Sequence, residues 1–462
     1  MHVRVSLALL ASIGAAACNF SQAGLDPTPT TMNFPIAIEL FQPDPAAADA
    51  SHLFVVNSNF DLRFNTGSVQ AIDLARVNDL LASECGGGGE DCVLDRLTFI
   101  DDNRADMHPV ILDEVGLGSH ADGLALRPSD QRRLYFPVRS TRDLTSIDFD
   151  PASGFTCDQS YRAEVEPGTA RWDAADIPRC SDAHRVTRRE AVANERELDL
   201  TGDPVAVAVV PSLDVGSTEV GDFLLMALRD GRVALFLDDG SGASPELLHI
   251  ADGFPNNLVT LTMEPGTGVG WLTAVGTNEI ARVGIVVDSG TPSRSFVYDG
   301  GRLRLGGIDD GQDSRDIQFH PQRPDTAFIL SRRPESVIEV DLQRRGLTNM
   351  DFGLRAVFEV GRGPSRLVTT VIDGRTFVLA SCFDAQRLFI IDAEVGALVA
   401  VVGGFSGPFE TVIDPHANRL YMVDFSVSVI RVLDISPLAS GGVPTLIGTL
   451  GNLTPVMSLT GN

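Results

Sequence analysis

Pairs of short apolar runs, separated by a few polar residues, recur along the chain. The last example is "NRLYMVDFSVSVIRVLDI" at residues 418–435, with an aspartate near the end of the second run. Comparable stretches lie at 51–74, 132–150, 325–342 and 375–393. Each run is about five to eight residues long and is bounded by turn-forming residues, whereas average helices are longer. The pattern therefore predicts β-strands.

A further apolar run precedes these pairs and marks the start of a repeating unit. The starting runs are rich in Val, Ile, Leu and Thr, and most are followed by a proline or another turn residue, as expected where a strand ends. The starts are Pro35, Asp122, Asp203, Asn257, Arg315, Ser365 and Phe409. Four short strands repeated every ~40–50 residues are typical of a β-propeller blade. We predict an all-β, seven-bladed propeller of four-stranded antiparallel blades over residues 33–462.

The first two units are longer than the others, and their extra residues contain two pairs of cysteines. We place the insertions at about 78–117 and 155–201, and residues 73–85 favour a short helix in the first. The predicted disulfides are Cys85–Cys92 and Cys157–Cys180, because an exported chain meets an oxidising compartment. Closing such loops stabilises a fold by roughly 2.5 and 3.4 kcal/mol. Cys382 lies in an apolar run and is expected to be a buried free thiol.

Two units carry a repeat motif that resembles a known family. They are "GPFETVIDPHANRLYMVDFSVSVIRVLDI" at 407–435 and "ADGLALRPSDQRRLYFPVRSTRDLTSIDFD" at 121–150, with a partial match at 53–74. These stretches resemble the YVTN-type β-propeller repeat of exported bacterial proteins. The resemblance implies a propeller fold. It does not imply one function, since propellers of this type serve adhesion, binding and, in relatives, catalysis.

The N-terminus has the pattern of an export signal. Residues 1–17 contain one arginine, an apolar run and small residues ahead of Cys18, which is typical of a secretory signal peptide. A cysteine directly after "AAA" resembles the lipidation site of bacterial lipoproteins, although Ala15 stands where that family prefers leucine. We expect lipidated Cys18, a polar tether over 18–32 and, because Asn19 follows the cysteine, transport to the outer membrane. An ordinary secretory signal with an incidental cysteine is the alternative.

Charge and composition exclude several kinds of chemistry. The net charge is −26, and all 36 basic residues are arginine. Without lysine, Schiff-base and P-loop lysine mechanisms are excluded. A strongly acidic surface repels phosphate backbones, so we expect no nucleic-acid partner. The remaining composition, 44% hydrophobic and 21% charged, is that of a globular domain.

Familiar catalytic motifs are missing from the sequence. It contains no GxSxG, HExxH or CxxCH motif, and its eight histidines are not spaced as metal ligands. Acidic stretches at 237–242 and 309–316 are candidate calcium loops, although neither fits the EF-hand pattern. Solvated turns are the alternative interpretation, so a divalent cation is left open and no cofactor is predicted.

One group of charged residues follows from aligning the first strands of the units. The alignment puts Asp316, Arg366 and Glu410 at the same position in three successive blades. The first strand of a propeller blade lines the central channel, so these side chains are expected at one depth there. They form either a polar site for a small ligand or ion, or an ion-paired, water-filled channel.

Two hypotheses for function follow. The first is a non-catalytic, lipid-anchored propeller, expected to be monomeric, that acts as a binding or scaffold module on the bacterial envelope, with a small ligand or an envelope protein as its partner. The second is an enzyme, such as a lactonase-like hydrolase or a lyase, that holds a divalent metal in the channel.

Overall fold

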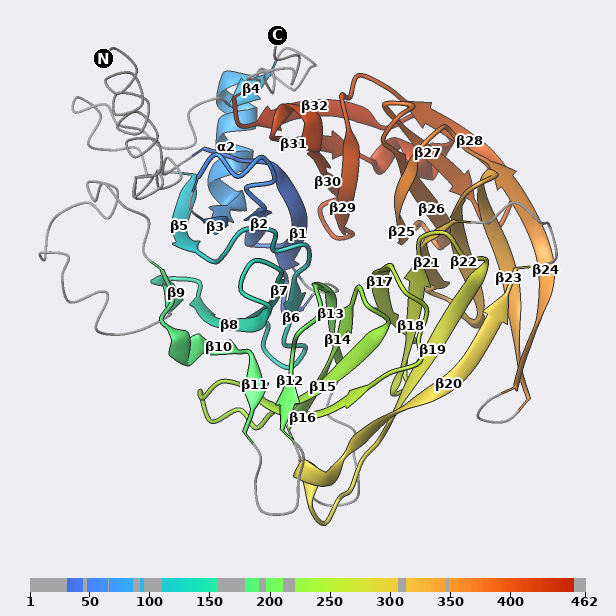
Figure 1. Cartoon of the computed structure of the whole chain (residues 1–462). Coiled ribbons are helices and arrows are strands. Elements are labelled where there is room, and N and C mark those ends of the chain that lie inside the picture. The colour runs from blue at the N-terminus through green and yellow to red at the C-terminus, as the bar shows by residue number, and fades with distance from the viewer. Residues whose placement is uncertain are drawn as a thin grey trace, which may run out of the picture.

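The protein is a seven-bladed β-propeller, as the strand pattern predicts (Figure 1). The computed structural model describes residues 31–44, 48–64, 66–85, 92–94, 110–156, 179–190, 197–210, 221–305, 313–345 and 349–452. The first strands of the blades surround the centre of the ring, and the fourth strands lie at its periphery (Figure 1). Within the described ranges, no helix is both long and apolar enough to cross a bilayer.

The strands of the first three blades are bounded as follows. Blade 1 contains β1 (Pro35–Phe41), β2 (His52–Asn57), β3 (Ser68–Asp73) and β5 (Ile111–Gly116). Blade 2 contains β6 (Ala125–Leu126), β7 (Arg133–Val138), β8 (Asp143–Asp150), β9 (Gly154–Thr156) and β10 (Arg185–Val186). Blade 3 contains β13 (Pro204–Val210), β14 (Asp222–Leu228), β15 (Arg232–Asp238) and β16 (Glu246–Ala251).

The other four blades are more regular. Blade 4 contains β17 (Leu258–Met263), β18 (Val269–Ala274), β19 (Glu279–Val286) and β20 (Phe296–Arg304). Blade 5 contains β21 (Ser314–His320), β22 (Arg323–Arg332), β23 (Glu335–Arg345) and β24 (Asn349–Glu359). Blade 6 contains β25 (Pro364–Ile372), β26 (Arg375–Cys382), β27 (Arg387–Asp392) and β28 (Ala397–Val402). Blade 7 contains β29 (Pro408–Asp414), β30 (Arg419–Asp424), β31 (Val429–Asp434) and β32 (Thr445–Leu450).

A few elements lie outside the blades. They are the helix α2 (Leu74–Glu84), the short strand β4 (Val93–Leu94), the β11–β12 hairpin (Arg188–Arg189 and Leu198–Asp199) and the 3-10 turns η2 (Asp182–His184), η3 (Pro292–Arg294), η4 (Phe425–Val427) and η5 (Ser436–Ser440). The predicted helix at 73–85 is confirmed. Asp73 accepts a hydrogen bond from the Arg76 backbone N–H at 3.1 Å and so caps the first turn of α2.

The core lies between the blades rather than inside one sheet. Second strands such as β2 and β14 are buried along their whole length, because a neighbouring blade covers each face. This is why they have continuous apolar sequences instead of alternating ones. Between blades 3 and 4, for example, Phe223 and Leu225 belong to the same apolar cluster as Leu261 and Leu272.

A bulge at the start of the first strand recurs in six of the blades. The register with the second strand shifts directly after Pro35, Pro204, Leu258, Ser314, Pro364 and Pro408. A bulge changes the direction in which the following side chains point. Its recurrence means that residues just after it are equivalent from blade to blade, which is the equivalence that the sequence alignment assumed.

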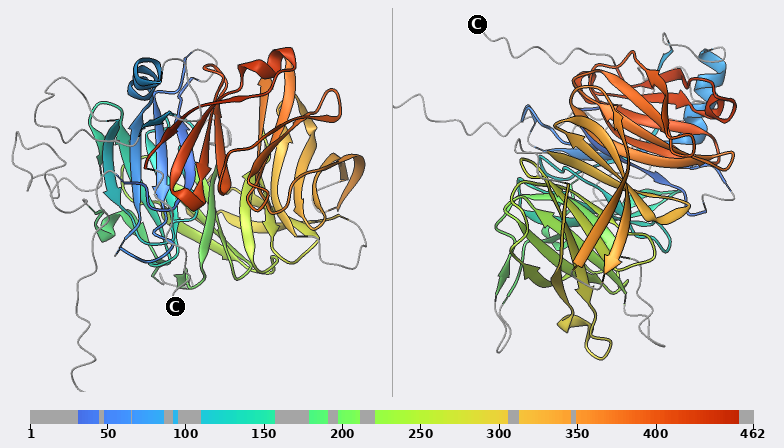
Figure 2. Two further views of the ribbon diagram at one scale, coloured as in Figure 1. Left: turned by 90° about the horizontal axis from the view of Figure 1, so that it is seen from above. Right: turned by 90° about the vertical axis from the view of Figure 1, so that its right-hand side faces the viewer.

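The first insertion closes the ring by joining blade 1 to blade 7. After α2, the disulfide Cys85–Cys92 returns the chain to β4, which pairs in parallel with β32. Thr449 N–H donates to the Cys92 carbonyl at 2.9 Å, and Gly451 N–H donates to the Leu94 carbonyl at 3.0 Å. Figures 1 and 2 show α2 beside the sheet of blade 7, although in sequence it lies between β3 and β5 of blade 1. Segments from the two ends of the propeller thus form one sheet.

Each predicted insertion range includes a strand that belongs to a blade, and one of the two predicted disulfides is confirmed. The range 78–117 includes β5, and the range 155–201 includes β10, and both strands belong to their blades. The disulfide Cys85–Cys92 is confirmed, and Cys382 is free and buried. Cys180 is disulfide-bonded, while its expected partner Cys157 lies outside the described residues, as do Cys18 and the whole N-terminal segment 1–30.

Candidate functional site

A cavity of about 680 Å³ runs along the centre of the ring. Residues from the first strand, or the segment leading into it, of all seven blades line this central channel. A second cavity of about 550 Å³ lies where the first strands begin and the second strands end; we call it the mouth. The two cavities share Asp122, Val205, Val259 and Arg366. A ligand at the mouth would therefore be in direct reach of the channel.

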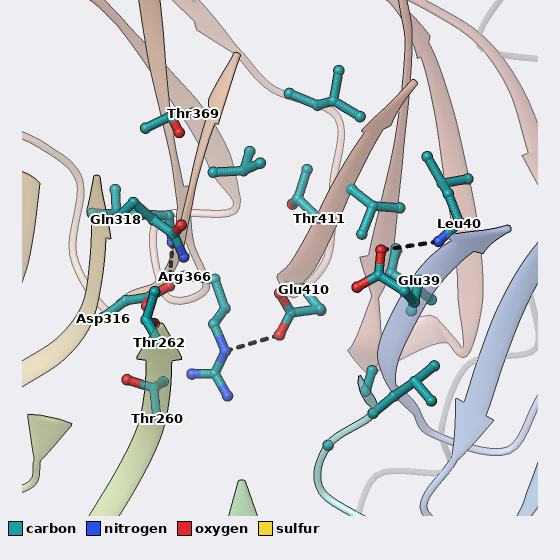
Figure 3. Close-up of a pocket in the computed structure, with 18 of the residues that line it drawn as sticks. Glu39, Leu40, Thr260, Thr262, Asp316, Gln318, Arg366, Thr369, Glu410 and Thr411 are labelled. Carbon is teal, nitrogen blue, oxygen red and sulfur yellow. Dashed lines mark hydrogen bonds and ion pairs between the residues drawn. The ribbon is translucent and has the colours of Figure 1, made fainter. Parts of the chain in front are cut away.

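Asp316, Arg366 and Glu410 all line the central channel (Figure 3). Arg366 Nε donates to Glu410 Oε2 at 2.9 Å, and the two side chains are 13% and 25% exposed. The Arg366 guanidinium also lies 4.7 Å from the centroid of the Phe409 ring. Three consecutive blades thus bring their charged groups together, and whether a ligand binds there stays a prediction.

Asp316 ties two blades together at the channel wall. It is only 2% exposed. Its Oδ1 accepts from its neighbour Ile317 N–H, and its Oδ2 accepts from Leu367 N–H on β25, both at 2.8 Å. Burial raises the pKa of Asp316 to about 7, against the opposing effect of the nearby Arg366 cation. A carboxyl with such a pKa exchanges its proton near neutral pH.

Glu39 is a further carboxyl of the channel wall, and the sequence alignment missed it. It lies on β1 among apolar neighbours and accepts a hydrogen bond from Leu40 N–H at 3.1 Å (Figure 3). Burial raises the pKa of Glu39 to about 7, and the charge of Glu410 contributes in the same direction. The alignment left out the first strand of blade 1, but a glutamate within "PIAIELF" was a usable signal.

Hydroxyl and amide groups complete the channel wall. Thr260 and Thr273 hydroxyls lie 2.7 Å apart, and Ser381 and Thr411 hydroxyls lie 3.0 Å apart. Gln318 also lines the channel (Figure 3). The wall therefore offers donors, acceptors and ionisable groups in one cavity, a composition suited to a polar small molecule.

Metal binding has little support in the described part of the chain. No group of three His, Cys, Asp or Glu side chains among these residues is arranged to hold a metal ion. In the candidate calcium loop at 237–242, Asp238 accepts from the Tyr135 hydroxyl at 2.6 Å and pairs with Arg133 at 3.2 Å. Its carboxylate thus neutralises a buried arginine. Residues 309–312 of the other acidic loop lie outside the described residues.

Comparison with known proteins identifies the fold. No protein-family model matches the chain, and no curated protein matches it in sequence. Among solved structures, hydrazine synthase from Kuenenia stuttgartiensis is similar, with a TM-score of 0.52, 10% identity and coverage of 90% of this chain and 98% of that one. The Pseudomonas aeruginosa periplasmic gluconolactonase PpgL has a TM-score of 0.50 and 12% identity, with coverage of 80% of this chain and 84% of that one. The β-propeller domain of Myceliophteria thermophila Cps50 (Swd1) has a TM-score of 0.50 and 9% identity, with coverage of 87% of this chain and 96% of that one.

These similarities support the propeller and nothing finer. At 9–12% identity the three proteins share the architecture with this chain, and they are named for unrelated roles. A fold that carries so many functions does not select one of them. The function has to be argued from the channel itself.

Proposed function

We propose that this chain is an exported, lipid-anchored β-propeller that binds a small molecule in its central channel. The observation that carries the proposal is the channel wall, where Glu39, Asp316, Arg366 and Glu410 line an open cavity. Apolar side chains would fill the same space at lower cost, since burying ionisable groups is unfavourable unless they are paired or used. A concave cavity with convergent polar groups and perturbed pKa values is the usual form of a ligand site.

The anchor rests on the sequence. The pattern of residues 1–17 followed by Cys18 supports export and lipidation, and the polar stretch after Cys18 supplies length between the lipid and the ring. It ends before Met32, which packs in the core of the propeller. Replacing Cys18 by serine would remove the acylation site without touching the propeller. The Cys18→Ser variant should leave the membrane fraction and retain its thermal stability. Unchanged membrane association would refute the lipoprotein part of the proposal.

Binding in the channel can be tested by blocking it. A thermal-shift screen with a chemically diverse panel of sugars, amines, carboxylates and phosphates should reveal compounds that stabilise the protein. Val259 lines both cavities, so Val259→Trp should abolish the effect of true channel ligands. Val443 is 51% exposed, and Val443→Trp is the matched control that should leave the effect intact. Stabilisation that survives in Val259→Trp would place binding elsewhere.

An enzymatic function in the same channel is the second candidate. The observation in its favour is the pair of carboxyls, Glu39 and Asp316, with pKa values of about 7, since such groups suit general acid–base catalysis. One solved propeller with this architecture is a gluconolactonase. Hydrolysis of sugar lactones that is lost in Asp316→Asn would favour the enzyme, and loss of that activity with a chelator would add a metal. If the wild-type protein hydrolyses no sugar lactone, the enzymatic candidate is rejected and the binding function remains.

A further inference from the structure

The mouth of the channel is lined by five arginines although the chain is strongly acidic overall. They are Arg139, Arg229, Arg315, Arg332 and Arg366. Asp122 is the one carboxylate among the described residues that line this cavity. Burial raises the pKa of Asp122, while the nearby Arg139 cation opposes that effect. The surface that a ligand meets at the mouth is therefore cationic.

Three of these arginines occupy the same position of the repeat. Arg139, Arg229 and Arg332 stand at the end of the second strand in blades 2, 3 and 5. The backbone N–H of each arginine donates to the backbone carbonyl of the residue just before the first strand of the same blade or, in blade 2, just before the isolated β-bridge that leads into it. The distances are 3.1, 2.8 and 2.8 Å respectively. The equivalent donors in blades 6 and 7 are Phe383 and Phe425. Blades 1 and 4 have Ser58 and Val275 at this position. The position is therefore cationic in blades 2, 3 and 5 and aromatic in blades 6 and 7.

Carboxylates hold most of the arginines in place from outside the cavity. Arg315 pairs with Asp313 at 2.8 Å, and Arg332 pairs with Asp384 at 3.2 Å. Neither carboxylate lines the mouth. A guanidinium fixed in this way loses less conformational entropy when it binds an oxyanion. The carboxylates pre-organise the site, and they also limit its net charge.

Two features show that the cationic charge at the mouth is not fully compensated. Arg229 is exposed, and its guanidinium has no ion-pair or hydrogen-bond partner in the part of the chain that the structure describes. The pKa of Arg315 is lowered mainly by burial; the charge of its partner Asp313 opposes the fall, and the cations Arg332 and Arg366 contribute to it. Like charges brought together in this way repel each other, and an oxyanion between them would remove that repulsion.

Two aromatic rings also line the mouth. Phe60 and Phe409 line the cavity, and Phe60 is 55% exposed. Phe425 lies behind both, with ring centroids 5.7 Å from Phe60 and 6.2 Å from Phe409. An exposed phenylalanine held at the edge of a cavity offers an apolar surface to a ligand.

We propose that the mouth binds a small organic anion, with its carboxylate or phosphate among the arginines and its apolar body against Phe60 and Phe409. This inference rests on the proposed binding function and specifies the class of ligand. Arginine favours both oxyanions because its planar guanidinium matches their geometry with two hydrogen bonds.

The experiment is isothermal titration with four probes that separate charge from shape. They are 3-phenylpropionate, phenyl phosphate, the neutral 3-phenylpropan-1-ol and inorganic phosphate. We expect the two organic anions to bind at least about 10-fold more tightly than the alcohol, because one charge-assisted contact contributes roughly that factor. They should also bind more tightly than inorganic phosphate, which has no apolar body to place against the phenylalanines. The better of the two organic anions identifies the oxyanion group.

Arg229→Ala is the decisive variant because its exposed side chain supports no described contact of the fold. It should weaken both organic anions by roughly 10-fold or more. Arg232→Ala is the matched control: Arg232 lies on the same blade, lines neither cavity and pairs with Asp230 at 2.7 Å. It should leave their affinity unchanged. Both variants should stay folded, with unfolding midpoints within about 2 °C of the wild type, since Arg232→Ala removes only an exposed pair.

Several results would overturn the inference while leaving the proposed function standing. One is that the alcohol binds as tightly as 3-phenylpropionate. Another is that Arg229→Ala has no more effect on affinity than Arg232→Ala. A third is that none of the four probes binds at millimolar concentration, while other compounds stabilise the wild type and not Val259→Trp. If no compound of any class depends on Val259, the proposed function itself is wrong.

Discussion

Arg366 holds together the charged groups of the central channel, and its removal is the sharpest test of how they interact. In Arg366→Ala, Glu410 loses the donor at 2.9 Å, and Asp316 loses the cation that opposes the rise of its pKa. Arg232→Ala removes a guanidinium from an exposed pair instead, since the side chain of its partner Asp230 is 43% exposed. The two variants differ mainly in how far the carboxylate that loses its arginine partner is shielded from water.

The expected cost of Arg366→Ala lies between two measured classes. Breaking a fully buried ion pair costs ~3–5 kcal/mol, and exposed pairs contribute ~0–1 kcal/mol. With 13% and 25% exposure, the Arg366–Glu410 pair should be worth about 2–3 kcal/mol, and the lost contact with Phe409 adds roughly 0.5–1 kcal/mol. For roughly 400 residues, a loss of about 3 kcal/mol corresponds to a fall in Tm of about 3–4 °C.

The assay is thermal and denaturant unfolding of wild type, Arg366→Ala and Arg232→Ala at about pH 7 and about pH 4. At neutral pH, Arg366→Ala should be the less stable variant by about 2–3 kcal/mol. At the lower pH the gap should shrink, because carboxyls left without a cation then take up protons and lose their charge. Equal losses for both variants at both pH values would show that the three residues do not interact.

The remaining predictions concern protons and cysteines. Asp316 keeps its proton in the folded state up to about pH 7, whereas the unfolded chain releases it near its usual pKa of 3.8. The contribution of Asp316 to the unfolding free energy should therefore fall as pH rises from about 4 to about 7, by up to about 4 kcal/mol. Asp316→Asn should show a shallower fall. If its unfolding free energy depended on pH as steeply as that of the wild type, the raised pKa of Asp316 would be contradicted. The double variant Cys85→Ser/Cys92→Ser should lose roughly 2.5 kcal/mol of unfolding free energy; full stability would mean that other contacts hold the closing loop. Mass mapping of the unreduced protein should link Cys157 to Cys180 and leave Cys382 free, and any linkage of Cys382 would contradict its buried position.

The regular parts of the fold could be predicted because their signals are local. Six of the seven unit starts lie within one residue of the observed first strands; only Asp122 precedes its strand by more. Apolar runs identify strands because each blade is covered on both faces, and the recurring bulge keeps equivalent positions in register. This is why Asp316, Arg366 and Glu410 could be assigned to one depth from spacing alone.

Contacts between distant segments could not be read from the sequence. The β4 strand has two residues and pairs with β32 across more than three hundred residues, so no local pattern announces it. The arginines of the mouth come from separate blades, and only an alignment of second-strand ends would have shown that Arg139, Arg229 and Arg332 are equivalent. The pKa of Glu39 depends on burial, which a sequence does not report.

The most direct test of a ligand site at the mouth of the channel is a crystal structure of the protein soaked in selenate. Selenate is an oxyanion, and the anomalous scattering of selenium locates it without bias. The account predicts an anomalous peak inside the mouth, within hydrogen-bonding distance of the guanidinium of Arg229, Arg332 or another of the five arginines that line it. Peaks only at arginines outside the cavity, such as Arg232, with none in the mouth, would contradict it.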